Sequence, residues 1–116
     1  MRMNNTTQTA SPSRTPAIGD ILASEWGYEQ TNVDFYLVTK VTKASVVLAH
    51  MVARKVSQGY GQGITTPTSE FVGQRITRRF KTYTNFKGEA TYGVKINSYA
   101  SARPWDGSPV RYTDWY

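Results

Sequence analysis

The sequence contains no cysteine and only one histidine, His50. The chain therefore forms no disulfide bond, and it offers no thiolate ligand for a zinc site. Zinc sites built from several imidazoles need more histidines than the sequence has. We therefore expect no metal site and no cofactor.

Motifs for nucleophilic catalysis are also missing. A nucleophilic enzyme needs a nucleophile, a base and a group that orients the base, and the chain has no Gly-x-Ser-x-Gly motif. The single histidine alternates with apolar residues in the segment 46–52, which is typical of a structural strand position. The carboxylates Glu25, Glu29 and Asp34 lie in a loop, where we expect Asp34 and Asn32 to cap turns. We thus predict no catalytic residue and a protein that is not an enzyme.

Long hydrophobic runs are absent, and none approaches the roughly 18 residues of a membrane-spanning helix. The first 16 residues, MRMNNTTQTASPSRTP, also lack the apolar stretch of a signal peptide. We therefore expect a cytoplasmic protein with no membrane contact. The same residues are rich in Asn, Thr, Ser and Pro, and we predict a disordered tail at 1–16 before a single domain at 17–116.

Basic residues outnumber acidic ones by 14 to 8, which gives a net charge of +6. The charges are segregated: residues 20–34 hold four acids and no Lys or Arg, whereas residues 40–87 hold nine bases and one acid. Such an excess of positive charge is typical of proteins that bind a polyanion, most often nucleic acid. The alternative is a basic protein without a specific anionic partner.

Alternation of apolar and polar residues predicts a mainly β fold. The clearest strand covers residues 34–42, where β-branched and aromatic residues dominate. Residues 46–52 also alternate, although their spacing matches a helix as well, and a helix is the alternative there. Further strands are predicted at residues 18–23, 75–84 and 90–98. Short strands joined by hairpins indicate a small antiparallel barrel or bent sheet of the SH3-like kind.

Turn-forming residues punctuate this pattern. Residues 57–69 contain Gly59, Gly61, Gly63 and Pro67, and we predict a long loop there. A phosphate-binding loop is the alternative, but the Lys-Ser/Thr sequel and the strand–helix frame of such loops are missing. A late Trp-Asp-Gly sequence predicts a tight turn. The apolar residues near the C-terminus are expected to dock on the barrel, with a last strand as one option: Val110, Tyr112, Trp115 and Tyr116.

The basic and aromatic segment 75–83 is the strongest functional candidate. On a strand, Arg79, Lys81 and Tyr83 share one face at steps of about 6.6–7 Å, while Phe80 belongs with the core. Lysine and arginine neutralise phosphates, and an interleaved ring stacks on a base. The predicted nucleic-acid-binding residues are Lys40, Lys43, Arg54, Lys55, Arg75, Arg78, Arg79, Lys81 and Tyr83. The alternative is an ordinary solvated strand face whose charges protect an edge from aggregation.

Two stretches of sequence are unusual: Trp26-Gly-Tyr-Glu-Gln-Thr-Asn-Val-Asp-Phe-Tyr followed by Val38-Thr-Lys-Val-Thr, and Pro104-Trp-Asp-Gly-Ser-Pro. Together they resemble a group of small bacteriophage and mobile-element proteins, whose usual motifs read SWGYDQTNVDFY early and WDGxP late. The resemblance covers most of residues 17–116, and Glu29 stands where the group commonly has Asp. It implies a phage or mobile-element origin and expression inside a bacterial cell, and it transfers no catalytic residue.

The acidic and aromatic loop at residues 25–36 supports an alternative function. Carboxylates beside aromatic rings superficially resemble a sugar or cation site, but Trp26 and Tyr28 are expected to cover one end of the barrel. The loop is also a candidate surface for contact with another protein, since Trp and Tyr are enriched in such contacts. The predicted protein-binding residues are Glu25, Trp26, Tyr28, Glu29 and Asp34. The main hypothesis is thus a phage accessory protein that binds nucleic acid without strong sequence preference. One alternative is an inhibitor of a bacterial host protein, and another is a minor structural or assembly protein that self-associates.

Overall fold

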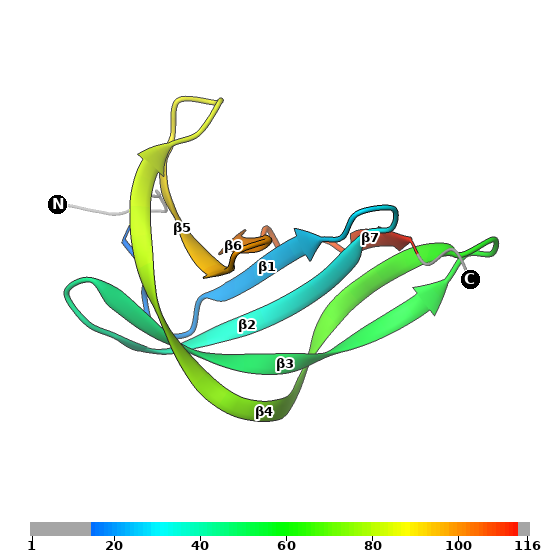
Figure 1. Cartoon of the computed structure of the whole chain (residues 1–116), viewed down its shortest axis with the longest axis horizontal. Coiled ribbons are helices and arrows are strands. Elements are labelled where there is room, and N and C mark those ends of the chain that lie inside the picture. Colours follow the sequence, from blue (N-terminus) through cyan, green and yellow to red (C-terminus); the bar gives the residue numbers. More distant parts are fainter. Residues whose placement is uncertain (1–14, 114–116) are drawn as a thin grey trace, which may run out of the picture.

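The computed structural model describes residues 15–113, and every regular element in this range is a β strand (Figure 1). The strands are β1 (Ile21–Trp26), β2 (Asn32–Val41), β3 (Ser45–Ser57), β4 (Gln62–Thr84), β5 (Ala90–Asn97), β6 (Ala100–Pro104) and β7 (Val110–Thr113). All paired strands run antiparallel. Within the described range no helix is long and apolar enough to cross a membrane. The predicted mainly β class is confirmed.

Six of the strands close into a ring. Hydrogen bonds join them in the order β3-β2-β1-β6-β5-β4, and β4 pairs back onto β3. β7 adds to the first residues of β4 beside this ring. The predicted small antiparallel barrel or bent sheet is therefore confirmed.

Alternate residues of these strands form the main hydrophobic core inside the ring. One layer crosses three strands through the paired residues Val38, Leu48 and Ile76, and the first two are fully buried. Burying a side chain of this size contributes roughly 1.5–3 kcal/mol, so these layers supply much of the stability of the fold. The other buried members of this core are Leu22, Tyr36, Val46, Tyr92, Val94, Ile96, Ala100 and Ala102.

The opposite face of β1, β2 and β3 is covered as well. Phe35 and Met51 are paired across β2 and β3, and Tyr112 of β7 belongs to the same buried cluster. The ring of Trp105 meets that of Phe35 edge to face, with centroids 5.6 Å apart. Because β2 is covered on both faces, Phe35 and its neighbour Tyr36 are both buried, and β2 departs from simple alternation.

The long strand β4 positions the candidate site. Its first half pairs with the end of β3 and with β7, and its second half pairs with the start of β3 and with β5. Gly73 lies between the halves, where the register against β3 shifts, and its φ of 77° is a conformation that favours glycine. Beyond the ring, β4 and β5 continue as a hairpin that projects from the molecule (Figure 1). One face of this hairpin is therefore open.

The segment 57–69, predicted as a long loop, is mostly strand. The chain turns at residues 59–61, all three of which have positive φ, and β4 begins directly afterwards at Gln62. The amide of Gln58 donates to the carbonyl oxygen of Gln62 at 2.8 Å and closes this short turn. The loop prediction is wrong because it extended the turn through residues that belong to β4.

Two residues that suggested a loop have other roles in β4. A Cβ at Gly63 would lie 2.7 Å from the hydroxyl oxygen of Tyr112 and 2.2 Å from the carbonyl oxygen of Val56, so glycine is required for this packing. Pro67 is paired with Ala53 beside a register shift, and a bulge is one of the few strand positions that tolerate proline. Gly63 therefore marks a position of close packing, and Pro67 marks a bulge.

The first strand starts later than residues 18–23, where it was predicted. Gly19 has a φ of 99°, and the amide of Asp20 donates to the carbonyl oxygen of Ala17 at 3.0 Å, so residues 17–20 form a turn. β1 therefore starts at Ile21, and the backbone of Gly19 and Asp20 bonds to that of Val38 in β2.

The remaining strand predictions hold. Residues 46–52 are strand, as part of β3, and the helical alternative is wrong. The predicted strands at 75–84 and 90–98 correspond to the second half of β4 and to β5, and β7 supplies the last strand. Trp115, Tyr116 and nearly all of the predicted N-terminal tail lie outside the described residues.

Candidate nucleic-acid interface

A groove of about 1090 Å³ lies on the outer face of the barrel. Its lining comes from β1, β4, β5, β6, the segment between β6 and β7, and the start of β7. Five cationic side chains, two carboxylates and the rings of Tyr83 and Trp105 line it. The charged members are Arg79, Lys81, Lys95, Arg103, Arg111, Glu25 and Asp106. We call this surface the basic groove.

The alternation of β4 directs its contribution to the groove. Phe80 packs inward, with its ring edge to face against that of Tyr92 at a centroid distance of 6.4 Å. The residues on either side, Arg79 and Lys81, therefore belong to the outer face, as does Tyr83 two residues later. The structure thus places together the three residues that the sequence assigned to one basic face.

The neighbouring strands continue this face. Lys95 of β5 pairs with Ser101 of β6, and Arg103 of β6 pairs with Ala23 of β1. All four residues line the groove. Since paired residues project from the same side of a sheet, cationic side chains follow one another across β4, β5 and β6.

A glycine, which has no side chain, lies at the base of the groove. Gly93 pairs with Lys81, and a Cβ placed on it would lie 3.4 Å from Cε1 of Tyr83. The tyrosine ring therefore lies against the backbone of β5, with 44% of the residue exposed. The ring of Tyr83 is therefore held in place and is still accessible to a ligand.

A tight turn fixes the second aromatic ring. The Nε1–H group of Trp105 donates to the carbonyl oxygen of Ser108 at 2.7 Å, and the ring packs against Phe35. The backbone amide and the hydroxyl of Ser108 both donate to Oδ1 of Asp106, at 2.9 and 2.6 Å. The turn predicted from the Trp-Asp-Gly sequence is therefore confirmed, and it holds Trp105 at the edge of the groove.

These hydrogen bonds also set the charge of the turn. The side chain and the backbone of Ser108 hold the pKa of Asp106 below its ordinary value, and the positive charge of Lys87 lowers this pKa further. Asp106 is therefore ionised at neutral pH, and it is one of the two carboxylates that offset the cations of the basic groove.

The groove has an excess of positive charge that the protein does not neutralise. Its five cationic side chains outnumber its two carboxylates by three. Within residues 15–113, no Lys or Arg side chain lies within 4.0 Å of a carboxylate, and the only such contact joins the imidazole of His50 to Asp34. None of the groove cations is therefore engaged in an ion pair with a described carboxylate, so the described part of the chain leaves all five available to an anionic ligand.

Two other predicted binding residues lie beside the groove. Lys40 and Lys43 are on the β2–β3 hairpin, whose residue Ser45 pairs with Arg79. The amide of Phe80 also donates to the carbonyl oxygen of Ala44, at 3.2 Å. The hairpin thus borders β4 where β4 enters the groove.

Three predicted binding residues lie elsewhere. Arg54 and Lys55 pair with residues 66 and 65, in the first half of β4, and neither lines the groove. The ammonium group of Lys55 lies 5.0 Å from the centroid of the Tyr112 ring. Arg75 is exposed near the bend of β4 and does not line the groove either.

Arg78 has a local role. It is on the inner face of β4, where its Nε–H group donates to the carbonyl oxygen of Ile96 at 2.7 Å and Nη1 donates to that of Thr77 at 2.9 Å. The side chain thus bridges β4 and β5 at a level where their backbones are not paired. It does not line the basic groove.

The predicted binding residues omitted three cations of the groove and the ring of Trp105. Lys95 alternates outward from the buried residues of β5, so the pattern that predicted this strand could have identified it. Arg103, Trp105 and Arg111 follow in the last part of the chain, where no register could be assigned from the sequence. They join the groove only because β6 pairs with β1 and β5 and because β7 pairs with the start of β4.

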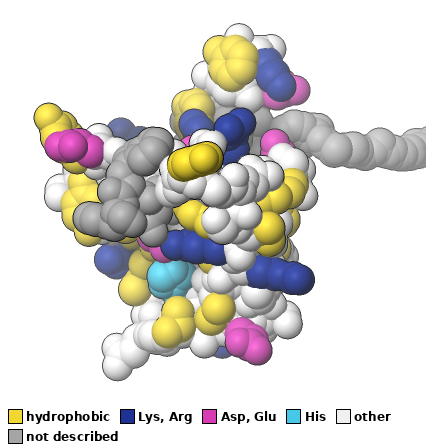
Figure 2. Space-filling view, turned by 90° about the vertical axis from the view of Figure 1, so that its right-hand side faces the viewer, with side chains coloured by type: hydrophobic (Ala, Val, Ile, Leu, Met, Phe, Trp, Pro, Cys, Tyr) yellow, Lys and Arg dark blue, Asp and Glu magenta, His cyan; other side chains and the backbone are white. Residues whose placement is uncertain are grey.

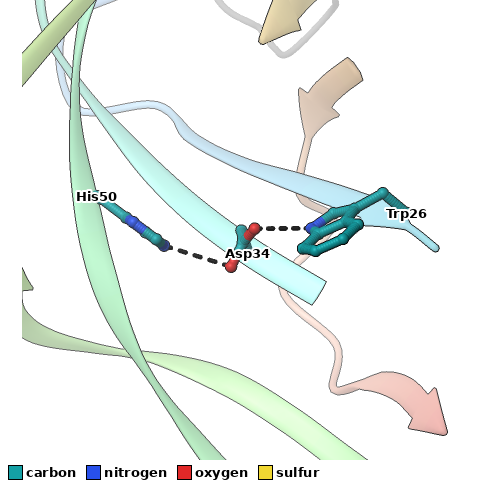
Figure 3. Close-up of polar contacts among 3 residues, drawn as sticks. All are labelled: Trp26, Asp34 and His50. Carbon is teal, nitrogen blue, oxygen red and sulfur yellow. Dashed lines mark hydrogen bonds and ion pairs between the residues drawn. The ribbon is translucent and has the colours of Figure 1, made fainter. Parts of the chain in front are cut away.

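Two residues of the predicted protein-binding loop, Trp26 and Asp34, bond to each other within the molecule. The Nε1–H group of Trp26 donates to Oδ2 of Asp34 at 2.7 Å, and Nε2 of His50 lies 3.4 Å from Oδ1 of the same carboxylate (Figure 3). Trp26 also packs against the ring of Tyr99, with centroids 5.3 Å apart. Asp34 pairs with Ser24 in the interior of β2, so the prediction that it caps a turn is wrong.

The other members of this loop are exposed. Tyr28 has 96% of its surface accessible, so the prediction that it covers one end of the barrel is wrong. Glu25 and Glu29 are exposed too, and Glu25 faces the basic groove. Gly27, which precedes the tyrosine, has a φ of 129°, and a Cβ there would lie 2.1 Å from the carbonyl oxygen of Gln30. The loop conformation therefore presents Tyr28 outward.

The histidine completes a small polar and aromatic cluster at one side of the molecule. Its ring stacks on that of Tyr36, with centroids 4.9 Å apart and planes inclined by 26°. Burial, together with the nearby carboxylate of Asp34, raises the pKa of Tyr36 to about 12. Figure 2 shows the histidine, in cyan, at the surface among basic, acidic and hydrophobic side chains. Among residues 15–113 no group of three or more His, Cys, Asp or Glu side chains could hold a metal ion.

No family model matches the chain, and neither a curated protein nor a solved structure matches it. The resemblance to phage and mobile-element proteins therefore stays a prediction.

Proposed function

We propose that this protein binds nucleic acid through the basic groove, as a small accessory protein of a phage or mobile element. The observation that supports the proposal is the convergence of five cationic side chains from β4, β5, β6 and β7 on one concave surface, none of them in an ion pair with a carboxylate of residues 15–113. Two accessible rings on the same surface offer stacking contacts.

The proposed mechanism is neutralisation of phosphates. Each lysine or arginine that meets a phosphate releases bound counterions, so the logarithm of the binding constant falls by about 0.7–0.9 per contact for each tenfold rise in salt. The groove is formed by strands and a turn, and it offers no helix that enters a major groove. Binding should therefore depend on charge and shape, with little preference for sequence.

Paired variants of equal charge test the proposal. Arg79→Gln with Arg103→Gln removes two cations from opposite sides of the groove, whereas Arg54→Gln with Arg75→Gln removes two exposed arginines that lie outside it. We expect the groove pair to reduce the salt slope by about 1.4–1.8 and the control pair to leave it unchanged. Fluorescence anisotropy with a labelled oligonucleotide across a salt series measures both slopes. Equal losses in the two pairs would show that only net charge matters and that the groove is not the binding site.

Binding of a bacterial host protein remains the second candidate, and the exposure of Tyr28 favours it. Since Trp26 and Asp34 bond to each other, the contact surface would consist of Tyr28 with Glu25 and Glu29. A pull-down from bacterial lysate separates the candidates if it is repeated after nuclease treatment. A stoichiometric protein that survives nuclease and is lost in Tyr28→Ala supports the second candidate, and proteins that disappear with nuclease support the first.

A further inference from the structure

The basic groove combines aromatic rings with cations, and this combination bears on the form of nucleic acid that fits it. Tyr83 is 44% exposed and lies against the bare backbone of Gly93. In a duplex each base is covered by its neighbours, and a protein ring reaches the face of a base only at the cost of unstacking it. A ring inside a groove is therefore suited to a strand whose bases are already unpaired.

The width of the groove points the same way. Arg79 and Lys81 are on β4 and Arg103 is on β6, with β5 between them. Two strand spacings separate β4 from β6, which is about 9.5 Å. A duplex, whose major groove alone is about 12 Å wide, is broader than this floor. A single sugar–phosphate backbone can lie between the two rows of cations.

The spacing of the cations and the volume of the groove indicate how many nucleotides it can hold. Cations along β4 recur at every second residue, about 6.6–7 Å apart, which is similar to the repeat of an extended single strand. The volume of about 1090 Å³ is near the upper end of sites that enclose a drug-sized ligand, roughly 300–1,000 Å³. The groove therefore has room for a few nucleotides.

We infer that the ligand of the basic groove is single-stranded nucleic acid. Its phosphates lie over Lys95 of β5, between Arg79 and Lys81 on one side and Arg103 on the other, and one base stacks on Tyr83. This inference rests on the proposed function and specifies its substrate class. Because every base has an aromatic face, such stacking discriminates single strands from duplex without reading sequence.

The experiment compares single-stranded and duplex probes in the same buffer. Labelled oligothymidylate, oligouridylate and a mixed-sequence duplex are titrated by anisotropy, each about 12 nucleotides or base pairs long, within the site sizes known for single-strand binders. Tyr83→Ala removes the stacking ring. Tyr60→Ala removes a tyrosine that is 94% exposed on the opposite hairpin tip and serves as the matched control.

We expect single strands to bind at least tenfold more tightly than the duplex, and the better of the two homopolymers identifies the preferred sugar. Tyr83→Ala should weaken single-strand binding by about 5- to 150-fold, as for other stacking rings, while Tyr60→Ala has no effect. Equal or tighter binding of the duplex would overturn the inference and leave the proposed function intact. An unchanged affinity in Tyr83→Ala would also overturn it. Failure of every probe to bind at low salt would instead refute the proposed function itself.

Discussion

Alkaline pH should destabilise this protein through one buried tyrosine. Tyr36 is 7% exposed, and burial is the main cause that raises its pKa from 10.0 to about 12. The charge of the Asp34 carboxylate and the titratable hydroxyl of Tyr99 raise this pKa further, and the charge of Arg78 lowers it. Below pH 10 the hydroxyl is protonated in both the folded and the unfolded chain. In that range Tyr36 therefore adds no pH dependence to the free energy of unfolding. Between pH 10 and about 12 the unfolded chain releases the proton while the folded protein retains it, and the free energy of unfolding falls.

The size of this loss follows from the two pKa values. The difference corresponds to at most about 2.7 kcal/mol, reached when the pH passes the folded pKa. Denaturant unfolding of the native protein and of Tyr36→Phe, at pH 8 and at pH 11.5, measures it. The phenylalanine variant shares all the other tyrosines and lysines, so it should lose less stability over this interval than the native protein. Equal losses in both proteins would refute the assignment of the effect to Tyr36.

Three substitutions, two of them with a matched control, test the packing by denaturant unfolding. Gly63→Ala should cost about 3 kcal/mol because its Cβ would lie 2.2 Å from the carbonyl oxygen of Val56, whereas Gly93→Ala, whose Cβ meets nothing closer than 3.4 Å, should cost less than about 1 kcal/mol. Leu48→Ala should cost about 2–5 kcal/mol because the side chain is fully buried, and the same change at the 48% exposed Val56 should cost about 0.5 kcal/mol or less. Asp34→Ala should cost about 1–3 kcal/mol because it leaves the part-buried indole N–H without its acceptor at 2.7 Å. A reversed order within either pair, or an unchanged stability in Asp34→Ala, would contradict the packing described.

Much of the fold could be predicted because each strand carries a local pattern. The alternation around Tyr92, Val94 and Ile96 matches a strand with one buried face, and these three residues are buried as predicted. β2 was also recognised, although Phe35 and Tyr36 are both buried, because β-branched and aromatic residues dominate it. Local patterns identify such strands without information on their neighbours.

The errors arose where a residue serves a contact that is distant in sequence. Gly63 is glycine because Tyr112 and Val56 approach it, and neither residue is visible from the loop-like sequence around it. Asp34 looked like a turn residue because the sequence does not show that Trp26 and His50 lie on adjacent strands beside it. Long-range pairing overrides local turn chemistry at both positions.

Only part of the candidate site could be predicted, because local patterns do not show which distant segments of the chain meet. Arg79, Lys81 and Tyr83 share a strand, so periodicity alone places them on one face. The other cationic side is formed by Arg103 and Arg111, twenty or more residues later, and the pairings of β6 in the ring and of β7 with β4 bring it near. Arg54 and Lys55 are at a similar distance in sequence from the basic segment, but they pair with the first half of β4 and lie outside the groove.

The most direct test of the central claim is to map the contact surface in solution. Amide chemical shifts of ¹⁵N-labelled protein are followed while single-stranded oligonucleotide is added at low salt. The account predicts that the perturbed amides cluster at residues 79–83, 93–95, 101–103 and 105–111, which form the basic groove. Perturbations centred on the loop of Tyr28, or shifts spread evenly over the exposed lysines and arginines, would contradict it.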